Sequence, residues 1–180
     1  MSAKAGKSDR ANMRLFIAIN FGDDIVDSLV SIQDELKANG VQGKYTSSEN
    51  LHLTLAFIGE YDDPGKVLQV VLEVPFRPMT IKYEELQLFR DMCFVRFENH
   101  PGLLSYVRRL RRALDENGIP FDKKKFMPHI TLARKVDQMN ELPESGLNGV
   151  LNDINVDRIS LMKSELTRNG PIYTELGNNR

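Results

Sequence analysis

The segment His52-Leu53-Thr54-Leu55 has the pattern His-apolar-Thr-Leu, which recurs at His129-Ile130-Thr131-Leu132. Both copies are short, rich in β-branched and apolar residues, and alternate with a period of two, which predicts strands. Because residues i and i+2 of a strand share a face, each copy presents its histidine beside its threonine and points its apolar residues the other way. If the two strands lie side by side, two imidazoles and two hydroxyls converge on one cleft.

Helix and strand signals alternate around these two strands. Apolar spacing and end signals predict helices at residues 23–38, 62–74 and 103–117. The histidine strands are expected at 51–59 and 128–133, and the other strands at 14–19, 44–46, 79–89, 92–97, 153–165 and 172–176. The histidine strands fall at corresponding places in two halves. The order predicts an α+β, bilobal fold, in which two small antiparallel β-sheets related by a pseudo-twofold line a central cleft, with helices packed outside.

Length and composition favour one bilobal domain over residues 13–180, preceded by a disordered extension at 1–12. A chain of 180 residues can bury a real core, and no low-complexity linker separates the halves. Residues 1–12 are small, polar and basic, without the apolar segment of a secretory signal. No apolar run approaches the ~18 residues that a membrane helix needs. We expect a monomer that does not contact membranes.

Charge and cysteine content narrow the class of partner and the compartment. The net charge of −1 provides no global basic field to recruit long nucleic acid, which leaves a small anionic ligand or a nucleic-acid end. The single cysteine, Cys93, cannot form an internal disulfide, which fits a cytoplasmic protein.

The paired motif fits general acid–base chemistry. A lone histidine in an apolar strand is usually structural, but two of the three histidines of this chain occur in the same pattern, His-apolar-Thr-Leu. Imidazole has an unperturbed pKa of about 6.5, so one ring can be neutral and take a proton from water while the other is protonated and gives one to a leaving oxygen. Threonine hydroxyls can donate to non-bridging oxygens as charge develops there. This arrangement suits in-line displacement at phosphorus with no metal and no cofactor.

These residues resemble the two-histidine (2H) phosphoesterases, in particular the RNA 2′,3′-cyclic phosphodiesterases, historically called 2′-5′ RNA ligases. Residues 13–19 look like the opening strand of that family, 49–60 and 128–134 like its two motifs, and 164–173 like its closing hairpin. The chain departs from the family before the first motif. Many members have a tryptophan and a proline where this chain has Tyr45 and Ser48, which bears on base stacking or turn shape and not on the chemistry.

The resemblance implies a role for each motif residue. His52 would be the general acid that protonates the leaving 3′ oxygen, and His129 the general base that activates water. Thr54 and Thr131 would bind the phosphate, and Arg134 would add positive charge there. Arg134 is five residues after His129, so an ideal strand points it to the opposite face. It reaches the cleft only if the strand bends, bulges or ends first.

Aromatic and basic side chains near the motifs are candidates to contact the rest of a substrate. The candidates to stack on a base are Phe16, Tyr45, Phe126 and Tyr173. Aromatic residues in strands more often belong to the core. The arginines within 108–112 lie off the apolar stripe of their helix and are expected to form a solvated face. The lysines at 123–125 precede the second motif and are better candidates to contact an RNA tail.

The sequence therefore predicts a metal-independent hydrolase, a cyclic phosphodiesterase that converts 2′,3′-cyclic phosphate ends of RNA or nucleotides to 2′-phosphates. A 2′-5′ RNA ligase or phosphodiesterase using the same site and a non-catalytic module that binds RNA ends stay open as alternatives. A metal hydrolase with histidine ligands is a third. Catalytic zinc usually takes three protein ligands, and no third histidine or cysteine has a suitable position, although a carboxylate could complete the set.

Overall fold

The computed structural model describes residues 13–143, 151 and 153–180. Within these residues the chain forms three α-helices and ten strands, and two four-stranded antiparallel sheets contain most of the strands. The predicted α+β fold is confirmed. The extension expected at residues 1–12 lies outside the described residues. None of the helices in the described part of the chain is long and apolar enough to span a membrane.

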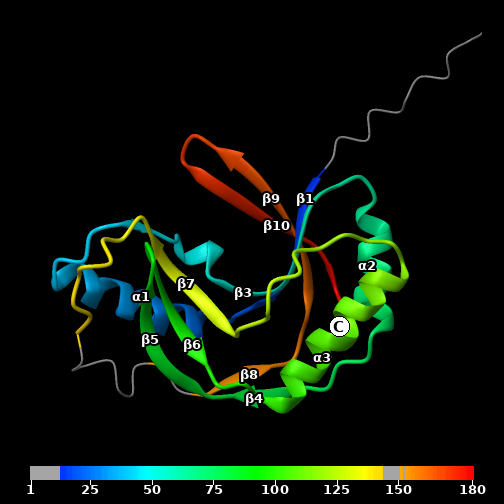
Figure 1. Ribbon diagram of the computed structural model, residues 1–180, viewed down its shortest axis with the longest axis horizontal. Coiled ribbons are helices and arrows are strands. Elements are labelled where there is room, and N and C mark those ends of the chain that lie inside the picture. The colour runs from blue at the N-terminus through cyan, green and yellow to red at the C-terminus, as the bar shows by residue number, and fades with distance from the viewer. Residues whose placement is uncertain (1–12, 144–150, 152) are drawn as a thin grey trace, which may run out of the picture.

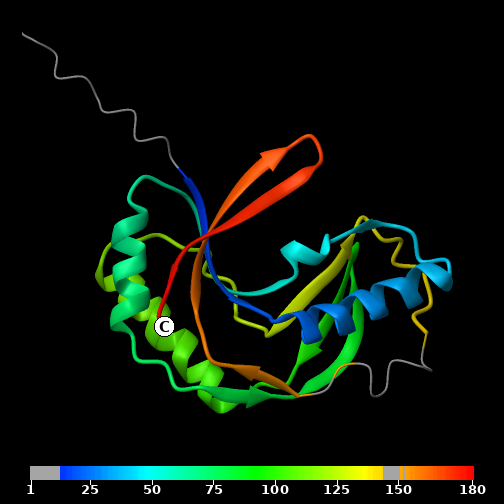
Figure 2. The same ribbon diagram turned by 180° about the vertical axis from the view of Figure 1, so that it is seen from behind.

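The first lobe is a four-stranded sheet with two helices on its outer side (Figure 1). All neighbouring strands of this sheet are antiparallel. In spatial order they are β10 (Gly170–Asn178), β9 (Ser160–Thr167), β1 (Met13–Asn20) and β3 (His52–Tyr61). Helices α2 (Pro64–Glu73) and α3 (Pro101–Glu116) pack against it, as the front and back views both show (Figures 1 and 2).

The second lobe is a four-stranded antiparallel sheet with one helix packed on one of its faces, the blue helix in front of the sheet in the view from behind (Figure 2). Its strands, in spatial order, are β2 (Lys44–Tyr45), β7 (His129–Arg134), β6 (Met92–Phe97) and β5 (Tyr83–Phe89). The helix is α1 (Asp23–Ala38), and a short 3₁₀ helix, η1 (Ser48–Asn50), leads from β2 into β3. Acidic residues in the first turn of α1 and a lysine in its last turn complement the helix dipole.

The chain crosses between the lobes through α1 and α3. β1 leads into α1, which packs behind β7 in the second lobe, and the chain then returns to β3 beside β1. β6 leads into α3, which contacts β3 in the first lobe, and the chain returns to β7 beside β6. The segments β1-α1-β3 and β6-α3-β7 thus share one arrangement, and each supplies its helix to the other lobe. This relation is the pseudo-twofold that the repeated motif predicts.

The apolar faces of the two histidine strands anchor this arrangement. Leu53 and Leu55 of β3 and Ile130 and Leu132 of β7 are each 0 % exposed and belong to one core cluster that spans both lobes. Burying such a side chain contributes about 1.5–3 kcal/mol. Cys93 also lies in this core, where burial raises the pKa of its thiol to about 11.

The structure corrects three predicted boundaries. The single strands expected at 79–89 and 153–165 are each divided, because their first residues form a separate two-stranded sheet of β4 (Met79–Ile81) with β8 (Ile154–Val156). The turn expected at 169–171 lies earlier, since Pro171 already pairs with Leu166. β10 is an edge strand, where a proline that lacks an N–H is tolerated.

Candidate active site

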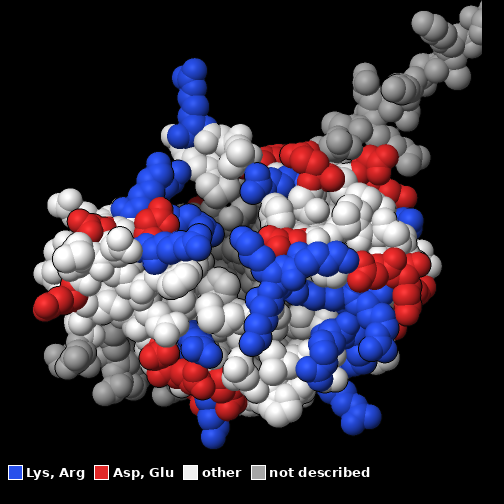
Figure 3. All heavy atoms as spheres, in the orientation of Figure 1, with Lys and Arg blue, Asp and Glu red and all other residues white. Residues whose placement is uncertain are grey.

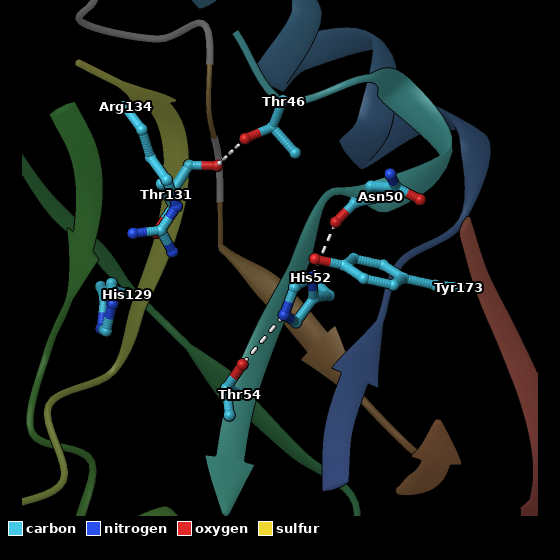
Figure 4. Close-up of a pocket in the computed structure, with 8 residues that line it drawn as sticks. All are labelled: Thr46, Asn50, His52, Thr54, His129, Thr131, Arg134 and Tyr173. Atoms are coloured by element: carbon cyan, nitrogen blue, oxygen red, sulfur yellow. Dashed lines mark hydrogen bonds between the residues drawn. The ribbon is translucent and has the colours of Figure 1, made fainter. Parts of the chain in front are cut away.

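A cavity of about 100 Å³ lies between the two histidine strands. Four of its lining residues are the two histidines and two threonines of the repeated motif, so the predicted convergence is observed. β3 and β7 belong to different sheets, and they meet across the cavity without pairing. Figure 4 shows these residues facing one space. The complete lining is Thr46, Asn50, His52, Thr54, His129, Thr131, Arg134 and Tyr173.

The two imidazoles are held in the same way. Nδ1 of His52 lies 2.7 Å from the backbone oxygen of Asn50, and Nδ1 of His129 lies 2.7 Å from that of Met127. Each partner is two residues before its histidine. A carbonyl oxygen only accepts, so Nδ1 carries the proton in both rings. Nε2 of each ring is therefore the atom available to accept or give a proton in the cavity.

The surroundings of His52 favour its neutral form. Its ring centroid lies 4.9 Å from that of Phe16 and 5.2 Å from that of Tyr173, and its Nε2 lies 2.9 Å from Oγ1 of Thr54. Burial lowers the pKa of His52, and the hydrogen bond to the Asn50 carbonyl partly opposes this effect. The positive charge that His129 and Arg134 would add lowers the pKa further.

A bulge in β7 brings Arg134 to the cavity. The register between β6 and β7 shifts between Thr131 and Ala133, which leaves Leu132 without an opposite residue. Leu132 and Ala133 are consequently both buried, and Arg134 returns to the face that carries His129 and Thr131. The strand had to bend, bulge or end before Arg134 for this side chain to reach the cleft, and it does so by this bulge.

The same bulge occurs in β3. Here Leu55 is the extra residue, between Thr54 and Ala56, and Phe57 occupies the position equivalent to Arg134. The repeat thus extends one residue beyond the four-residue pattern, to an alanine in each copy. Two neighbouring apolar residues after the threonine break the alternation in both copies, and this sequence signal could have revealed the bulges.

A buried glutamine supports the bulge in β7. Nε2 of Gln33 donates to the Leu132 oxygen at 3.0 Å and to the Thr46 oxygen at 2.8 Å. Gln33 lies on α1 and is 4 % exposed. Sequence reasoning missed it, although a glutamine beside Ile32 on the apolar stripe of a helix is a signal for a buried polar contact.

The candidate base-stacking residues lie in different places. Phe16 is 4 % exposed and packs against the rings of His52 and Tyr173. Tyr45 borders a cavity of about 370 Å³ that adjoins the histidine site and shares Tyr173 with it. Phe126 borders a third cavity, of about 230 Å³, at the end of the site near Thr54 and His129. The structure thus places Tyr45 and Phe126 in different cavities.

Positive charge surrounds the cleft despite the net charge of −1. Figure 3 shows a central hollow with lysine and arginine side chains on both sides. Lys124 and Lys125, from the loop before β7, line the cavity that contains Phe126, and Arg134 lines the histidine cavity. Among the residues that the structure describes, no group of three His, Cys, Asp or Glu side chains is placed to hold a metal ion.

Comparison with known proteins assigns the family. The family model described as "LigT like Phosphoesterase" matches residues 21–92 and 97–173, which include both motifs. The chain belongs to this family. The RNA 2′,3′-cyclic phosphodiesterase of Thermotoga maritima is 31% identical to this LigT-like phosphoesterase over 177 residues, covering 91% of this chain and 93% of the relative. The Escherichia coli K12 protein of the same name is 27% identical over 168 residues, with coverages of 91% and 93%.

Solved structures of relatives share the fold of this LigT-like phosphoesterase. A crystal structure from Thermus thermophilus matches with a TM-score of 0.76 at 27% identity, covering 92% of this chain and 96% of the other. Escherichia coli LigT complexed with 3′-AMP matches with a TM-score of 0.78 at 24% identity, with coverages of 93% and 96%. The predicted family and fold are therefore confirmed.

The environment of His52 predicts its titration. Because burial and the neighbouring positive charges disfavour the imidazolium, His52 should titrate below the ordinary value of 6.5 in the ligand-free protein. Inorganic phosphate in the cavity should raise this pKa, since an anion stabilises the protonated ring. NMR of the imidazole C2 protons, assigned with His52→Gln, measures both values. A pKa at or above 6.5 without phosphate would contradict this description of the site.

The contacts of Gln33 predict a loss of stability on its replacement. Gln33→Leu removes the side-chain donor from the Thr46 and Leu132 carbonyls and should lower the free energy of unfolding by about 1–3 kcal/mol. Gln69→Leu is the matched control, because Gln69 is exposed on α2 and its side chain donates to Glu73 on the same helix; its effect should stay within about 0.5 kcal/mol. Urea unfolding gives both values, and equal effects would count against a structural role for Gln33.

Proposed function

We propose that this LigT-like phosphoesterase is a metal-independent RNA 2′,3′-cyclic phosphodiesterase that opens cyclic phosphate ends to 2′-phosphates. The observation that carries the proposal is the pair of identically anchored imidazoles on one cavity, together with two threonine hydroxyls. Relatives that carry the name of this activity support the choice of substrate. We propose that the enzyme acts as a monomer, since a single chain brings both histidines and both threonines of the repeated motif to one cavity.

The proposed reaction uses one proton transfer at each imidazole. Nε2 of His129 takes a proton from a water molecule as its oxygen attacks phosphorus. The bond between phosphorus and the 3′ oxygen breaks, and Nε2 of His52 gives its proton to that oxygen. The bond to the 2′ oxygen stays intact, so the product is a 2′-phosphate. The two imidazoles account for both proton transfers, and for this reason the proposal includes no metal.

Three side chains are proposed to bind the phosphoryl group. The hydroxyls of Thr54 and Thr131 donate to its non-bridging oxygens, and Arg134 supplies fixed positive charge. In the ligand-free cavity Oγ1 of Thr54 lies against Nε2 of His52, and the phosphoryl group would enter between residues that already face it. The anion raises the pKa of His52 and so favours the protonated ring that a general acid requires.

The adjoining cavities suit the remainder of an RNA end. Tyr45 and Tyr173 border the cavity of about 370 Å³, which provides aromatic surface for the terminal base. At the other end of the site, Lys124 and Lys125 border the cavity that contains Phe126, and their ammonium groups suit backbone phosphates of an RNA tail.

Hydrolysis of 2′,3′-cyclic AMP in excess EDTA tests the proposed function. His52→Ala and His129→Ala should each lower kcat at least ~100-fold, the low end for the loss of one acid–base group. His100→Ala is the matched control, because His100 caps α3 through the amide of Gly102 and does not line the cavity. Its kcat should stay within a few-fold of the wild-type value.

Each other result of this assay has a defined meaning. A near-wild-type rate from either motif variant would remove that histidine from the mechanism. Loss of wild-type activity in EDTA would contradict the metal-independent mechanism. A 3′-phosphate product would contradict the direction of ring opening, and activity only on 2′-5′ linkages would favour the ligase or phosphodiesterase alternative.

The proposed roles also predict the dependence of the rate on pH. A general acid acts only when it is protonated, so the pH–rate profile contains a break at the pKa of His52. In kcat/KM, which reports the free enzyme, this break should lie at low pH, because burial and neighbouring positive charge lower the pKa of His52 there. In kcat the same break should lie at higher pH, since the bound anion raises that pKa. Profiles whose breaks coincide in kcat/KM and kcat would argue against His52 as the acid.

A further inference from the structure

Arg111 of α3 does not belong to the solvated face expected for its arginine cluster. Arg108 and Arg112 are exposed, but Arg111 is only half-exposed. Its Nε and Nη2 donate to the Leu55 oxygen at 3.3 and 3.1 Å, and its Nη1 donates to the Lys124 oxygen at 2.6 Å. The guanidinium also lies over the rings of two phenylalanines, Phe121 and Phe126. The expectation of a solvated side chain is wrong for Arg111 because backbone oxygens and aromatic rings surround it.

The two carbonyls that Arg111 joins belong to the two histidine segments. Leu55 is the bulged residue directly after Thr54 in β3. Lys124 lies in the loop that enters β7, three residues before Met127, whose oxygen holds Nδ1 of His129. β3 and β7 are not neighbours in either sheet, so no strand pairing fixes the distance between them. We infer that Arg111 is a positioning residue that sets the spacing between the imidazoles of His52 and His129.

An equivalent contact on the other lobe supports this inference. Gln33 of α1 holds the carbonyl of the bulged residue in β7, as Arg111 of α3 holds the carbonyl of the bulged residue in β3. In each case the donor comes from the helix that the other half of the chain supplies. The two contacts follow the pseudo-twofold, which indicates that holding the bulge carbonyl is part of how both histidine strands are placed.

The geometry requires a guanidinium. Its planar group presents donors in two directions, toward Leu55 and toward Lys124, whereas a lysine ammonium is a single point on a flexible stem. Among the described residues, no carboxylate lies within 4.0 Å of Arg111 to form an ion pair, so carbonyls and rings define its position. Arg111→Lys keeps the positive charge and loses the bridge between the two segments.

This inference rests on the proposed function for its kinetic test. A misplacement of about 1 Å can cost about 100-fold in rate, so Arg111→Lys should lower kcat on 2′,3′-cyclic AMP by about 10- to 100-fold. KM should change by less than about 3-fold, because Thr54, Thr131 and Arg134 remain. Arg112→Lys, an exposed neighbour on the same helix, is the matched control and should stay within about 2-fold of wild type. A kcat of Arg111→Lys within about 2-fold of wild type would overturn the inference.

A second measurement is independent of activity. Replacing His129 by Gln should raise the pKa of His52, measured by NMR, because it removes a nearby positive charge. If Arg111 sets the spacing, the same replacement in the Arg111→Lys protein should raise that pKa by less. An equal rise in both backgrounds would overturn the inference even if kcat fell. Arg111→Gln replaces Arg111→Lys in both measurements if the lysine variant does not fold.

The two measurements separate this inference from the proposed function. A wild-type protein that does not hydrolyse 2′,3′-cyclic AMP would count against the function, while the NMR comparison would still decide whether Arg111 sets the distance between the imidazoles. Hydrolysis by the wild type together with unchanged spacing in Arg111→Lys would support the function and reject the positioning role.

Discussion

The structure depends on burying the apolar faces of β3 and β7 in one core. The core-facing side chains of both strands are buried, and the strands lie in different sheets, each of which is covered by a helix from the opposite half of the chain. Because side chains alternate along a strand, burying one face of each strand leaves the other faces directed at a shared cavity. The histidines and threonines thus meet as a consequence of the same burial that stabilises the two lobes.

The bulge after each threonine changes which of the following residues of the strand face the cavity. It interrupts the alternation at a Leu-Ala pair in both strands, so Arg134 and Phe57 reach the cleft side. Arg134 brings charge to one motif and Phe57 brings apolar surface to the other. The cleft is therefore symmetric in its histidines and threonines and asymmetric in what surrounds them. This asymmetry would let two equivalent imidazoles take the different roles that we propose for them.

Local patterns in the sequence predict much of this arrangement and miss what depends on distant contacts. Period-two alternation places His52, Thr54, His129 and Thr131 on the cavity, because alternation is a property of the strand itself. It cannot show that the strand expected at 79–89 divides, since β4 pairs with a segment distant in sequence. Nor can it show that Arg111 is half-buried, because its partners lie on β3 and on the loop before β7.

In the proposed mechanism, two imidazoles on opposite sides of the cavity act on one phosphoryl group in a single in-line step. The most direct measurement is the stereochemical course at phosphorus, with one diastereomer of a 2′,3′-cyclic phosphorothioate opened in ¹⁸O-labelled water. Direct attack by water, with the acid on the opposite side, predicts inversion of configuration. Retention would mean two successive displacements through a covalent intermediate on the protein, and it would contradict the division of roles between His52 and His129.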